Sequence, residues 1–553
     1  MATSSPYPTR RHHLLPVVRP LLFGLGAALS TAAAPFQLPD TGAPASTTVV
    51  LLAIDDHAFP LRDNLALYLT TPTVRAEPVL QPSVDPNAPD NAATHFYGSV
   101  IREENRFRMW YYAVHTVSTE GAIGVSPVCY AESIDGEIWT RPHLGQVDWK
   151  GNRDNNLVAL GPDPTEACSG VSVIRDDTDP DPARRYKMVF GKQIETAAQQ
   201  RLGVSRRWVV RTAVSPDGLT WTQLPQVVSG DQFAELSSLY HHNGLYVVNS
   251  HIRSHGEGDR QEGRQGYAWV SPDFTHWLPQ SAPSFKTAEP LDGAGWGTHG
   301  NSGDDYTQVH LGVGATSLGN VAIGLYGMWH QRQPNWGEGG ITCDLGLLLS
   351  QDGLHFNEVV KGQPYLRSEQ SPAKPVAGKA YPTILCQTNS ILNVGDETWI
   401  YHGRWRNVDF QQLGSPTNDG TNVAQNYWGG VALAKLPRDR WGALALWAES
   451  DQGSLWTTPI TLPAAAALTA NAAGLSGLTF LVADERFNPI EGFAAGRAPA
   501  TDDNDQFDAA VIWAGHDLAE LAGQTVRLRV SFDRGTAPNP QLFALNLTPS
   551  SDE

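Results

Sequence analysis

The sequence predicts an all-β protein, a five-bladed β-propeller followed by a C-terminal β-sandwich. A turn signature recurs along the chain, paired strand-like runs recur at a spacing of about 70 residues, and the pattern changes after Trp441. Internal periods of this length are typical of repeat folds such as propellers. The chain contains 52 glycines and 39 prolines, and 17% of its residues are charged, a composition that suits many short strands joined by turns.

The turn signature combines Ser and Asp with an aromatic residue placed four positions after the Asp. The copies are Ser133-Ile134-Asp135-Gly136 with Trp139, Ser215-Pro216-Asp217-Gly218 with Trp221, Ser271-Pro272-Asp273 with Trp277, and Ser350-Gln351-Asp352-Gly353 with Phe356. An Asp side chain in such a turn accepts hydrogen bonds from the backbone amides that follow it. We therefore expect tight hairpin turns with a structural role, whose aromatic side chains pack between neighbouring sheets.

Each blade is predicted to begin with two antiparallel strands. The first runs start near His95, Glu166, Glu235, Asp305 and Tyr381, and the second runs are FRMWYYAV, YKMVFGK, LYVVNSH, VAIGLYGMWH and ETWIYHGRW. Because the second strand returns antiparallel to the first, the starts of first strands and the ends of second strands share one face of the propeller. We call this face the mouth, and we expect a polar ligand site there.

The predicted mouth gathers carboxylates and cations from separate blades. The residues that the strand ends place there are Asp90, His95, Glu166, Glu235, Asp304, Asp305, His115, Lys192, His251, Arg253, His330, Arg332, Arg404 and Arg406. Asp55 and Asp56 follow the apolar run 49–54; one of them points into the funnel if that run closes the ring, and otherwise they form a turn.

The chain is predicted to have three parts. Residues 1–34 have the features of an export signal, because Arg10, Arg11 and Arg19 precede the apolar stretch 21–29. Residues 47–450 form the propeller, and residues 451–553 form the sandwich, whose runs alternate between apolar and polar residues. No other stretch reaches the roughly 18 apolar residues that a membrane span needs, so we expect a secreted or periplasmic protein.

Net charge and cysteine content limit the expected partners, cofactors and disulfides. The net charge is −18, and an acidic protein repels phosphate backbones, so nucleic acid is not an expected partner. No compact His and Cys set has zinc spacing, so no cofactor is predicted, and a structural calcium ion is left open. In an oxidising space the four cysteines allow three pairings, of which we favour Cys129 with Cys168 and Cys343 with Cys386.

The strand-start carboxylates, the Asp turns and the trailing sandwich together resemble the five-bladed propeller glycoside hydrolases of families 43, 32 and 68 and uncharacterised bacterial relatives. The segments that carry the likeness are Asp55-Asp56, Tyr97-Gly98-Ser99-Val100, Met109-Trp110-Tyr111 and Arg185-Tyr186-Lys187-Met188. The resemblance implies an enzyme that cleaves a polysaccharide or oligosaccharide with three carboxylates from successive blades. Carried over by position at the strand starts, these are Glu166, Glu235 and Asp305, since the opening motif of family 32 is missing here.

Glycosidic cleavage needs a protonated carboxyl group that assists the leaving oxygen and an ionised one that activates water or attacks carbon. A close pair of carboxylates raises one pKa and so supplies the acid. Glu166 and Glu235 are the preferred pair, and the structural alternative is that each caps a loop or pairs with an arginine. Residues predicted to bind the substrate are Asp90, His95, His330, Arg332, Asp344, Arg404, Trp336 and Trp428, the tryptophans by stacking on sugar rings.

Two other functions stay open at this point. A glycan-binding propeller without catalysis would hold the carbohydrate with the same arginines and tryptophans and lack a working acid. A polysaccharide lyase would need a base and a charge-neutralising group near an acidic sugar, and His330 with Arg404 are the candidates. Measured activity separates these functions, because lyase products absorb in the ultraviolet and hydrolase products do not.

Overall fold

The computed structural model describes residues 48–549 except for 116–126, 162–167, 195, 203, 205–207, 231, 233, 256–260, 288–307, 332–339, 380, 409–425, 463–465, 500–503 and 536–538. The predicted export signal and the predicted site residues Glu166, Asp305, Arg332 and Trp336 lie outside the described residues. Strands dominate the described chain, and helix α1 (Thr196–Leu202) is a short exception. The all-β prediction is therefore confirmed. No helix in this part of the chain is both long and apolar enough to cross a membrane.

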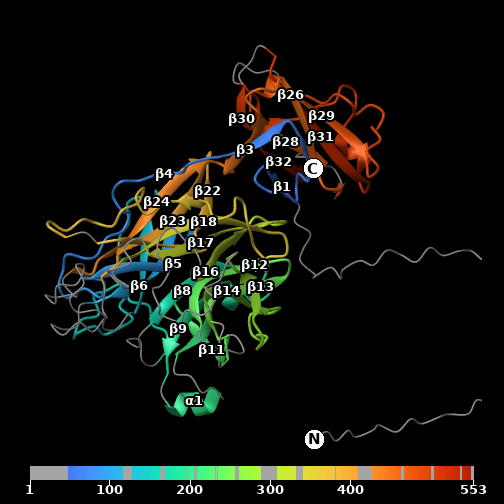
Figure 1. The fold of residues 1–553 in the computed structure, drawn as a ribbon. Helices are drawn as coiled ribbons and strands as arrows, with labels where there is room; N and C mark the ends of the chain where they lie inside the picture. Colours follow the sequence, from blue (N-terminus) through green and yellow to red (C-terminus); the bar gives the residue numbers. More distant parts are fainter. Residues whose placement is uncertain are drawn as a thin grey trace, which may run out of the picture. The chain divides into compact units, whose positions relative to one another are not determined.

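Five antiparallel blades follow one another along the chain (Figure 1). Blades 2 and 3 are separate sheets, whereas single parallel pairings, Cys343 with Ile384 and Gly429 with Ala93, join blades 4, 5 and 1 into one sheet of 13 strands. Blade 1 comprises β5 (Ala93–Glu103), β6 (Arg106–Val114) and β7 (Val128–Ser133); blade 2 comprises β8 (Cys168–Arg175), β9 (Tyr186–Gln193), β10 (Trp208–Ser215) and β11 (Thr222–Val227). Blade 3 comprises β12 (Glu235–His242), β13 (Leu245–His255), β14 (Gln261–Ser271) and β15 (Ala282–Phe285). Blade 4 comprises β16 (Gln308–Ser317), β17 (Ala322–Gln331), β18 (Ile341–Ser350), β19 (Asn357–Glu358) and β20 (Pro364–Leu366). Blade 5 comprises β21 (Thr383–Cys386), β22 (Ile391–Val394), β23 (Glu397–Arg406) and β24 (Gly429–Pro437).

An N-terminal strand completes the last blade. β4 (Thr73–Val74) pairs antiparallel with β24 at the outer edge of blade 5, so a segment that precedes blade 1 closes the ring. The apolar run 49–54 does not take part in this closure, and the segment with Asp55 and Asp56 forms a turn, which was the other alternative. Strand β1 (Val49–Leu52) of this run pairs with β32 (Gln541–Pro549) near the other end of the chain, where leucines of β32 bury its apolar side chains.

The Asp turns form as predicted. In each copy the Asp carboxylate accepts hydrogen bonds from two following backbone amides, for example from those of Glu137 and Ile138 to Asp135 at 2.9 and 2.8 Å. The residue after the Asp has a positive φ of 76°, 74°, 60° and 72° in chain order. Three of the four positions are glycine, which adopts this backbone without a steric cost, and the third is Phe274.

The turns also dock each blade on its neighbour. Tyr401 of blade 5 donates its hydroxyl to the Gly136 carbonyl at 2.7 Å, and Trp110 of blade 1 donates its indole N–H to the Gly218 carbonyl at 2.9 Å. Tyr240 of blade 3 donates likewise to the Gly353 carbonyl at 2.7 Å. Two of the predicted aromatic residues pack against these donors: the ring centroid of Trp139 lies 6.1 Å from that of Tyr401, and that of Phe356 lies 6.4 Å from that of Tyr240.

A chain of hydroxyl groups links the inner strands of the propeller. In each link a serine of one blade accepts a hydrogen bond from a backbone amide of the next: Val173 to Ser99 (2.8 Å), Leu239 to Ser172 (2.9 Å), Ala315 to Ser238 (3.3 Å) and Val100 to Ser390 (2.8 Å). Buried polar groups require hydrogen-bond partners, and the serines provide them for amides that the packing between blades would otherwise leave unpaired.

Asn389 lies at the centre of this arrangement and bonds to four other blades. Its amide nitrogen donates to the carbonyls of Val173 (3.1 Å) and Leu239 (2.9 Å), and its amide oxygen accepts from the Ser99 hydroxyl (2.6 Å). Its backbone carbonyl accepts from the Thr316 hydroxyl at 2.6 Å. One side chain of blade 5 therefore fixes the positions of blades 1, 2 and 3, and its backbone fixes blade 4.

Two further sheets contain the C-terminal strands. The first holds β1, β3 (Leu65–Leu69), β25 (Gly442–Leu446), β28 (Ala466–Ala473), β30 (Asp505–Ala510) and β32; the second holds β2 (Leu61–Asp63), β26 (Gln452–Trp456), β27 (Ile460–Thr461), β29 (Leu478–Asp484) and β31 (Thr525–Asp533). Leu468 and Leu545 of the first sheet and Phe480 and Leu528 of the second belong to one buried cluster, so the sheets share a core.

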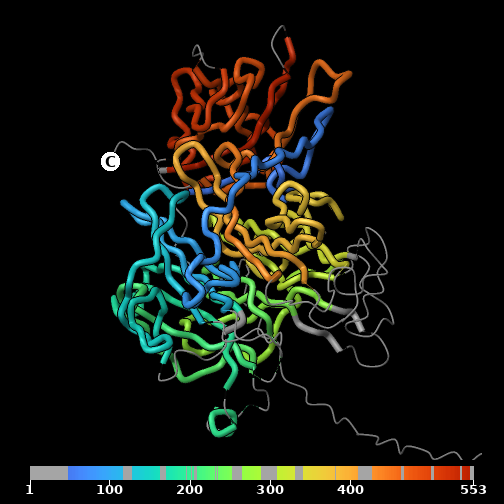
Figure 2. Tube along the Cα trace, turned by 90° about the vertical axis from the view of Figure 1, so that its left-hand side faces the viewer, coloured from blue at the N-terminus to red at the C-terminus, as the bar shows by residue number. Residues whose placement is uncertain are grey.

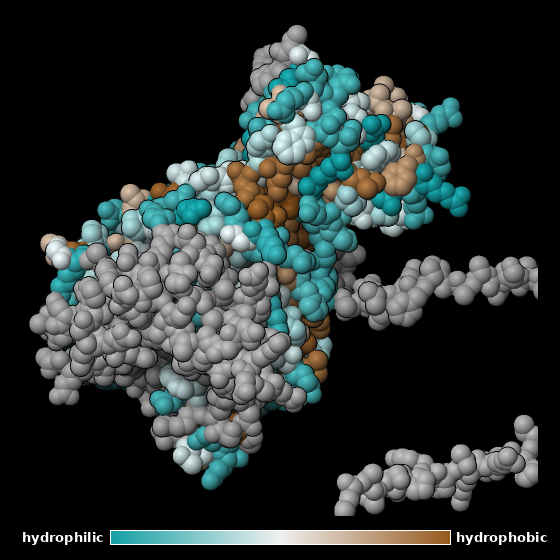
Figure 3. Space-filling view, in the orientation of Figure 1, coloured by the Kyte–Doolittle hydropathy of each residue, from teal (hydrophilic) through white to brown (hydrophobic). Residues whose placement is uncertain are grey.

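The sequence-based boundary at residue 450 differs from these pairings. β1, β2 and β3 were assigned to the propeller, yet each pairs with a strand from the C-terminal part of the chain. Figure 2 shows the N-terminal segment in blue among orange and red strands. One buried cluster contains Leu325 of blade 4 together with Ile54, Trp441 and Ala544. Figure 3 shows apolar residues (brown) beside the C-terminal part of the molecule.

Three cysteines are free and buried: Cys129, Cys343 and Cys386. The predicted pairs are therefore wrong, although the side chain of Cys168 lies outside the described residues. The register explains one case, because Cys343 lies opposite Ile384 rather than Cys386. The sulfur atoms also have separate partners, since the Cys343 thiol donates to the Asp344 carbonyl at 3.5 Å and the Trp405 indole donates to Cys386 at 3.0 Å.

We expect the unreduced, denatured protein to contain at least three thiols, because the free cysteines Cys129, Cys343 and Cys386 are too deeply buried to react before unfolding. Mass spectrometry after maleimide labelling in denaturant without reductant counts them. A count of two or fewer would show that a disulfide forms and would contradict this expectation.

Candidate functional site

Irregular first strands shape the mouth. Their pairing with the second strands shifts register between His95 and Ser99 in β5, between Leu236 and Ser238 in β12, and between His310 and Val313 in β16. β-Bulges at the rims of barrels and next to active sites redirect side chains. Here each bulge separates the hydroxyl chain of the inner strands from the residues that reach the mouth.

Side chains from four blades meet at this end of the propeller. We define the mouth cluster as His95, Tyr97, Tyr112, Glu235, His251, His310, Trp329, Trp405 and Tyr427. His95 lies at its centre, with ring centroids 4.4 Å from Tyr97, 4.9 Å from Tyr112 and 5.1 Å from Trp405. Its two ring nitrogens contact the hydroxyls of Tyr112 and Tyr427, the latter at 3.3 Å.

Glu235 is the carboxylate of the mouth cluster. It begins β12, pairs with His251 of β13, and keeps 29% of its side chain exposed. The His251 Nε2 atom lies 3.5 Å from the carboxylate, and its ring is fully buried. The backbone amide of Leu311 donates to His251 Nδ1 at 3.0 Å, so the ring proton of a neutral His251 resides on Nε2, facing Glu235.

Blade 4 contributes a stacked pair. The His310 ring stacks on Trp329 with centroids 4.7 Å apart, and the Arg264 guanidinium lies 4.6 Å from the Trp329 centroid. His310 Nδ1 is buried and has no hydrogen-bond partner among the described residues. Burial lowers the pKa of His310 well below its usual value, so the ring is neutral at ordinary pH and presents either a donor or an acceptor.

The buried tyrosine and cysteine near Glu235 are poor nucleophiles. Burial raises the pKa of Cys386 to about 12, with the charge of Glu235 adding to the effect. Burial also raises the pKa of Tyr97, and Glu235 contributes there as well. Both groups therefore keep their protons at neutral pH.

We expect thermal stability to fall as the pH drops below about 6.5, because burial lowers the pKa of both His95 and His402 from 6.5 to about 3. Between these two pH values the two histidines bind protons in the unfolded chain but not in the folded protein. The contribution of the neutral histidines to the free energy of unfolding is therefore complete above pH 6.5 and is lost toward pH 3. Each histidine accounts for up to about 1.4 kcal/mol per pH unit.

Melting temperatures of the parent and of His402→Gln between about pH 7 and pH 4 test this dependence. Gln keeps a polar group opposite Ser371, whose hydroxyl bonds to His402 at 2.8 Å. A smaller decline in the variant is the expected result, and parallel curves would contradict it.

Asp90 and Arg404 were expected at the mouth, but their contacts lie elsewhere. The Asp90 carboxylate is bound by Arg141 and Tyr111, at 2.7 and 2.8 Å, on the opposite face of β6 from Tyr112. Arg404 is buried and donates to the Ala76 carbonyl at 2.7 Å, while its neighbour Trp405 belongs to the mouth cluster. Successive residues of a strand point to opposite faces, so Arg404 of β23 faces away from the mouth cluster and Trp405 faces it.

The other described candidates also have structural contacts. His330 lies 3.9 Å from Asp344 with both side chains fully buried, and the backbone amide of Ser368 donates to Asp344 at 2.7 Å. Trp428 is buried beneath the Arg406 guanidinium, which lies 5.6 Å from its ring centroid. Of the residues predicted at the mouth that the structure describes, Glu235, His95 and His251 belong to the mouth cluster.

Sequence reasoning missed the aromatic members of the mouth cluster. Tyr97 and Tyr112 share a strand face with His95, and the alternation of β5 and β6 was the available signal. A prediction based on charged residues does not include these aromatic residues. No group of three or more His, Cys, Asp or Glu suited to hold a metal ion occurs in the described chain.

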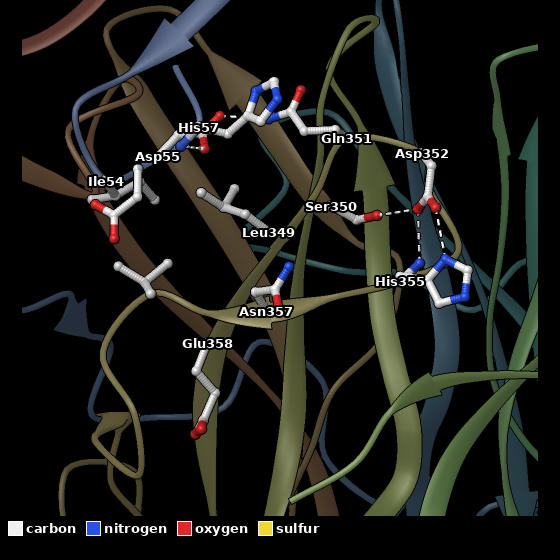
Figure 4. A pocket seen from close by; sticks show the side chains of 12 residues that line it. Ile54, Asp55, His57, Leu349, Ser350, Gln351, Asp352, His355, Asn357 and Glu358 are labelled. Carbon is white, nitrogen blue, oxygen red and sulfur yellow. Dashed lines mark hydrogen bonds and ion pairs between the residues drawn. The ribbon is translucent and has the colours of Figure 1, made fainter. Parts of the chain in front are cut away.

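A separate pocket of about 600 Å³ lies outside the mouth, between the segment 54–57 and the Asp turn of blade 4 (Figure 4). Gln351 donates to the buried Asp55 carboxylate at 2.5 Å, and the amide of His57 donates to it at 2.9 Å. Burial raises the pKa of Asp55. Asp55 therefore belongs to this pocket and does not enter the funnel.

No family model matches the chain. No curated protein matches it either. Solved structures with a similar fold include a glycosyl hydrolase from Bacteroides ovatus, which is 14% identical, with a TM-score of 0.40 over 68% of this chain and 95% of that chain. They also include a family 43 arabinoxylan arabinofuranohydrolase from Bacillus subtilis, which is 10% identical, with a TM-score of 0.36 over 86% of this chain and 99% of that chain. These likenesses concern the fold alone.

Proposed function

We propose that this protein is a glycoside hydrolase that binds a sugar unit at the mouth cluster and uses Glu235 as one of two catalytic carboxylates. The observation that best supports this role is the contrast between Glu235, whose side chain is 29% exposed, and the buried rings around it. A partly exposed carboxylate among aromatic side chains combines the acid–base group and the stacking surface that carbohydrate cleavage needs.

His251 acts in this proposal as a positioning residue for Glu235. The amide of Leu311 occupies Nδ1, so a second proton on the ring would break that hydrogen bond. The remaining N–H faces the carboxylate from a fully buried ring, at 3.5 Å between the two atoms. A buried donor of this kind restricts the carboxylate to one orientation relative to a bound sugar.

The second carboxylate is proposed to come from Glu166 or Asp305. Glu166 precedes β8 in blade 2 and Asp305 precedes β16 in blade 4, and these blades flank the blade of Glu235. The separation of the two carboxyl groups decides the stereochemistry: about 5 Å suits a retaining enzyme, and about 6.5–9.5 Å leaves room for the water of an inverting one.

The first test is release of reducing sugar from plant and algal polysaccharides and from aryl glycosides by the purified protein. Hydrolysis without a product that absorbs in the ultraviolet supports the proposal. Tight binding without cleavage would favour the glycan-binding alternative, and ultraviolet-absorbing products would favour a lyase. The buried contacts of His330 with Asp344 and of Arg404 with Ala76 argue against the lyase, because both side chains already have structural partners.

Export is proposed with this function, since polysaccharides lie outside the cell. Cleavage near Ala34 would remove the segment with Arg10, Arg11 and Arg19. The N-terminal mass of protein recovered from a bacterial periplasm or culture medium tests this, and an intact residue 1 would contradict it.

A further inference from the structure

A second polar pocket lies on blade 1, at the same end of the blade as the mouth cluster. It has a volume of about 560 Å³ and is formed by residues 83–90 before β5 and residues 141–156 after β7. Its lining includes Asp90, Arg141, Trp149, Lys150 and Asn152. The amide and carboxylate groups of this lining suit a hydroxylated ligand better than an apolar one.

Lys150 brings a positive charge to this pocket. Its ammonium group donates to His115 Nε2 at 2.7 Å, and His115 Nδ1 donates to the Ala88 carbonyl at 2.9 Å. Burial, together with Lys150, lowers the pKa of His115, which keeps the ring neutral and able to accept from the ammonium group. No carboxylate among the described residues forms an ion pair with Lys150, although the carboxylates of Asp85, Asp90 and Asp154 line the same pocket.

Asp90 lines the same pocket and has one carboxylate oxygen without a hydrogen-bond partner among the described residues. Arg141 Nε and the Tyr111 hydroxyl both donate to Oδ2, at 2.7 and 2.8 Å. Oδ1 is buried without a hydrogen-bond partner among the described residues, and the side chain of Asp90 is 1% exposed. A buried carboxylate oxygen is costly to leave unpaired, so this atom favours a ligand that donates a hydrogen bond.

From these two features we infer that the pocket binds one anionic sugar unit, with its carboxylate or sulfate at Lys150 and a hydroxyl donating to Asp90 Oδ1. A neutral sugar would satisfy the Asp90 oxygen only, and a simple anion would satisfy Lys150 only. A uronate or a sulfated sugar carries both groups on one ring. The inference rests on the proposed function for its ligand class, and it identifies the substrate as an acidic polysaccharide whose chain extends past the mouth.

The test is direct binding of D-galacturonate, D-galactose 6-sulfate and D-galactose to the full-length protein, measured by saturation-transfer NMR and calorimetry. We expect at least one anionic sugar to bind about tenfold more tightly than galactose, because a charge-assisted contact replaces a neutral one. Lys150→Gln should remove that preference. Arg153→Gln is the matched control, since Arg153 is an exposed cation of the same loop that bonds to the Gly145 and Gln146 carbonyls and does not line the pocket.

The two anionic sugars distinguish a uronate site from a sulfate site. Equal binding of galactose and both anionic sugars, or an unchanged preference in Lys150→Gln, would overturn the inference. If hydrolysis of aryl glycosides persists in that case, the proposed function stands without this site. If the preference depends on Lys150 but no substrate is cleaved, the pocket stands and the hydrolase proposal fails.

Discussion

Replacing Glu235 with glutamine is expected to lower kcat for glycoside hydrolysis by about 10²-fold or more, with a much smaller change in KM. Glutamine keeps the length of the side chain and an oxygen that can face His251 Nε2, but it cannot exchange a proton or attack carbon. Because binding contacts are retained, the loss falls on the chemical step. Initial rates on the best substrate of the polysaccharide panel measure the effect.

Glu132→Gln serves as the control for Glu235→Gln. Glu132 lies on β7 with 36% of its side chain exposed and contacts Arg106 at 3.5 Å, away from the mouth cluster. It should keep the parent rate. If Glu235→Gln retained more than about a tenth of that rate, its carboxylate would not take part in the chemistry, since removal of an acid or base costs at least 10²-fold.

Replacing Asn389 with leucine is expected to destabilise the propeller by about 3–5 kcal/mol, a large part of the stability of a typical domain. Leucine has a similar size but forms none of the three side-chain hydrogen bonds to Ser99, Val173 and Leu239. Removing one partner leaves the others unsatisfied between the blades, which costs more than the bond itself contributes. Denaturant unfolding, or thermal unfolding where refolding is reversible, measures the difference.

Asn357→Leu is the control for Asn389→Leu. Asn357 begins β19, is exposed to solvent and pairs with Leu349 of the same blade. Its substitution should change stability by less than about 0.5 kcal/mol. Equal stability of the two variants would show that the blades hold together without the central asparagine.

The sequence signals that succeeded are local ones. The Asp turns depend on contacts within five residues, from Asp135 to Trp139 in the first copy, so the signature alone predicts their conformation. The five strand pairs follow from antiparallel neighbours in the chain. Glu235 was found for the same reason, because it lies at the first residue of a strand whose start the repeat spacing defines.

The signals that failed depend on contacts between distant segments. Whether Arg404 or Trp405 faces the mouth depends on which face of β23 packs against blade 1. The sequence of β23 alone does not predict this. The pairing of Val49 with Leu547 joins the two ends of the described chain, and a strand of four apolar residues fits many partners. His310 was missed because the search for carboxylates placed the start of its strand at Asp305, three residues before Gln308.

The pairing of β1 with β32 and of β4 with β24 has a consequence for how the chain reaches this fold. During synthesis the N-terminal strands emerge long before their partners β24 and β32. The ring cannot close until β24 has been made, and the sheet that contains β1 cannot be completed until β32 has been made. Such distant pairing makes folding slow and leaves strand edges open to aggregation in the interval. A chain shortened after blade 5 would lose the partner of β1 and would present that apolar strand to other molecules.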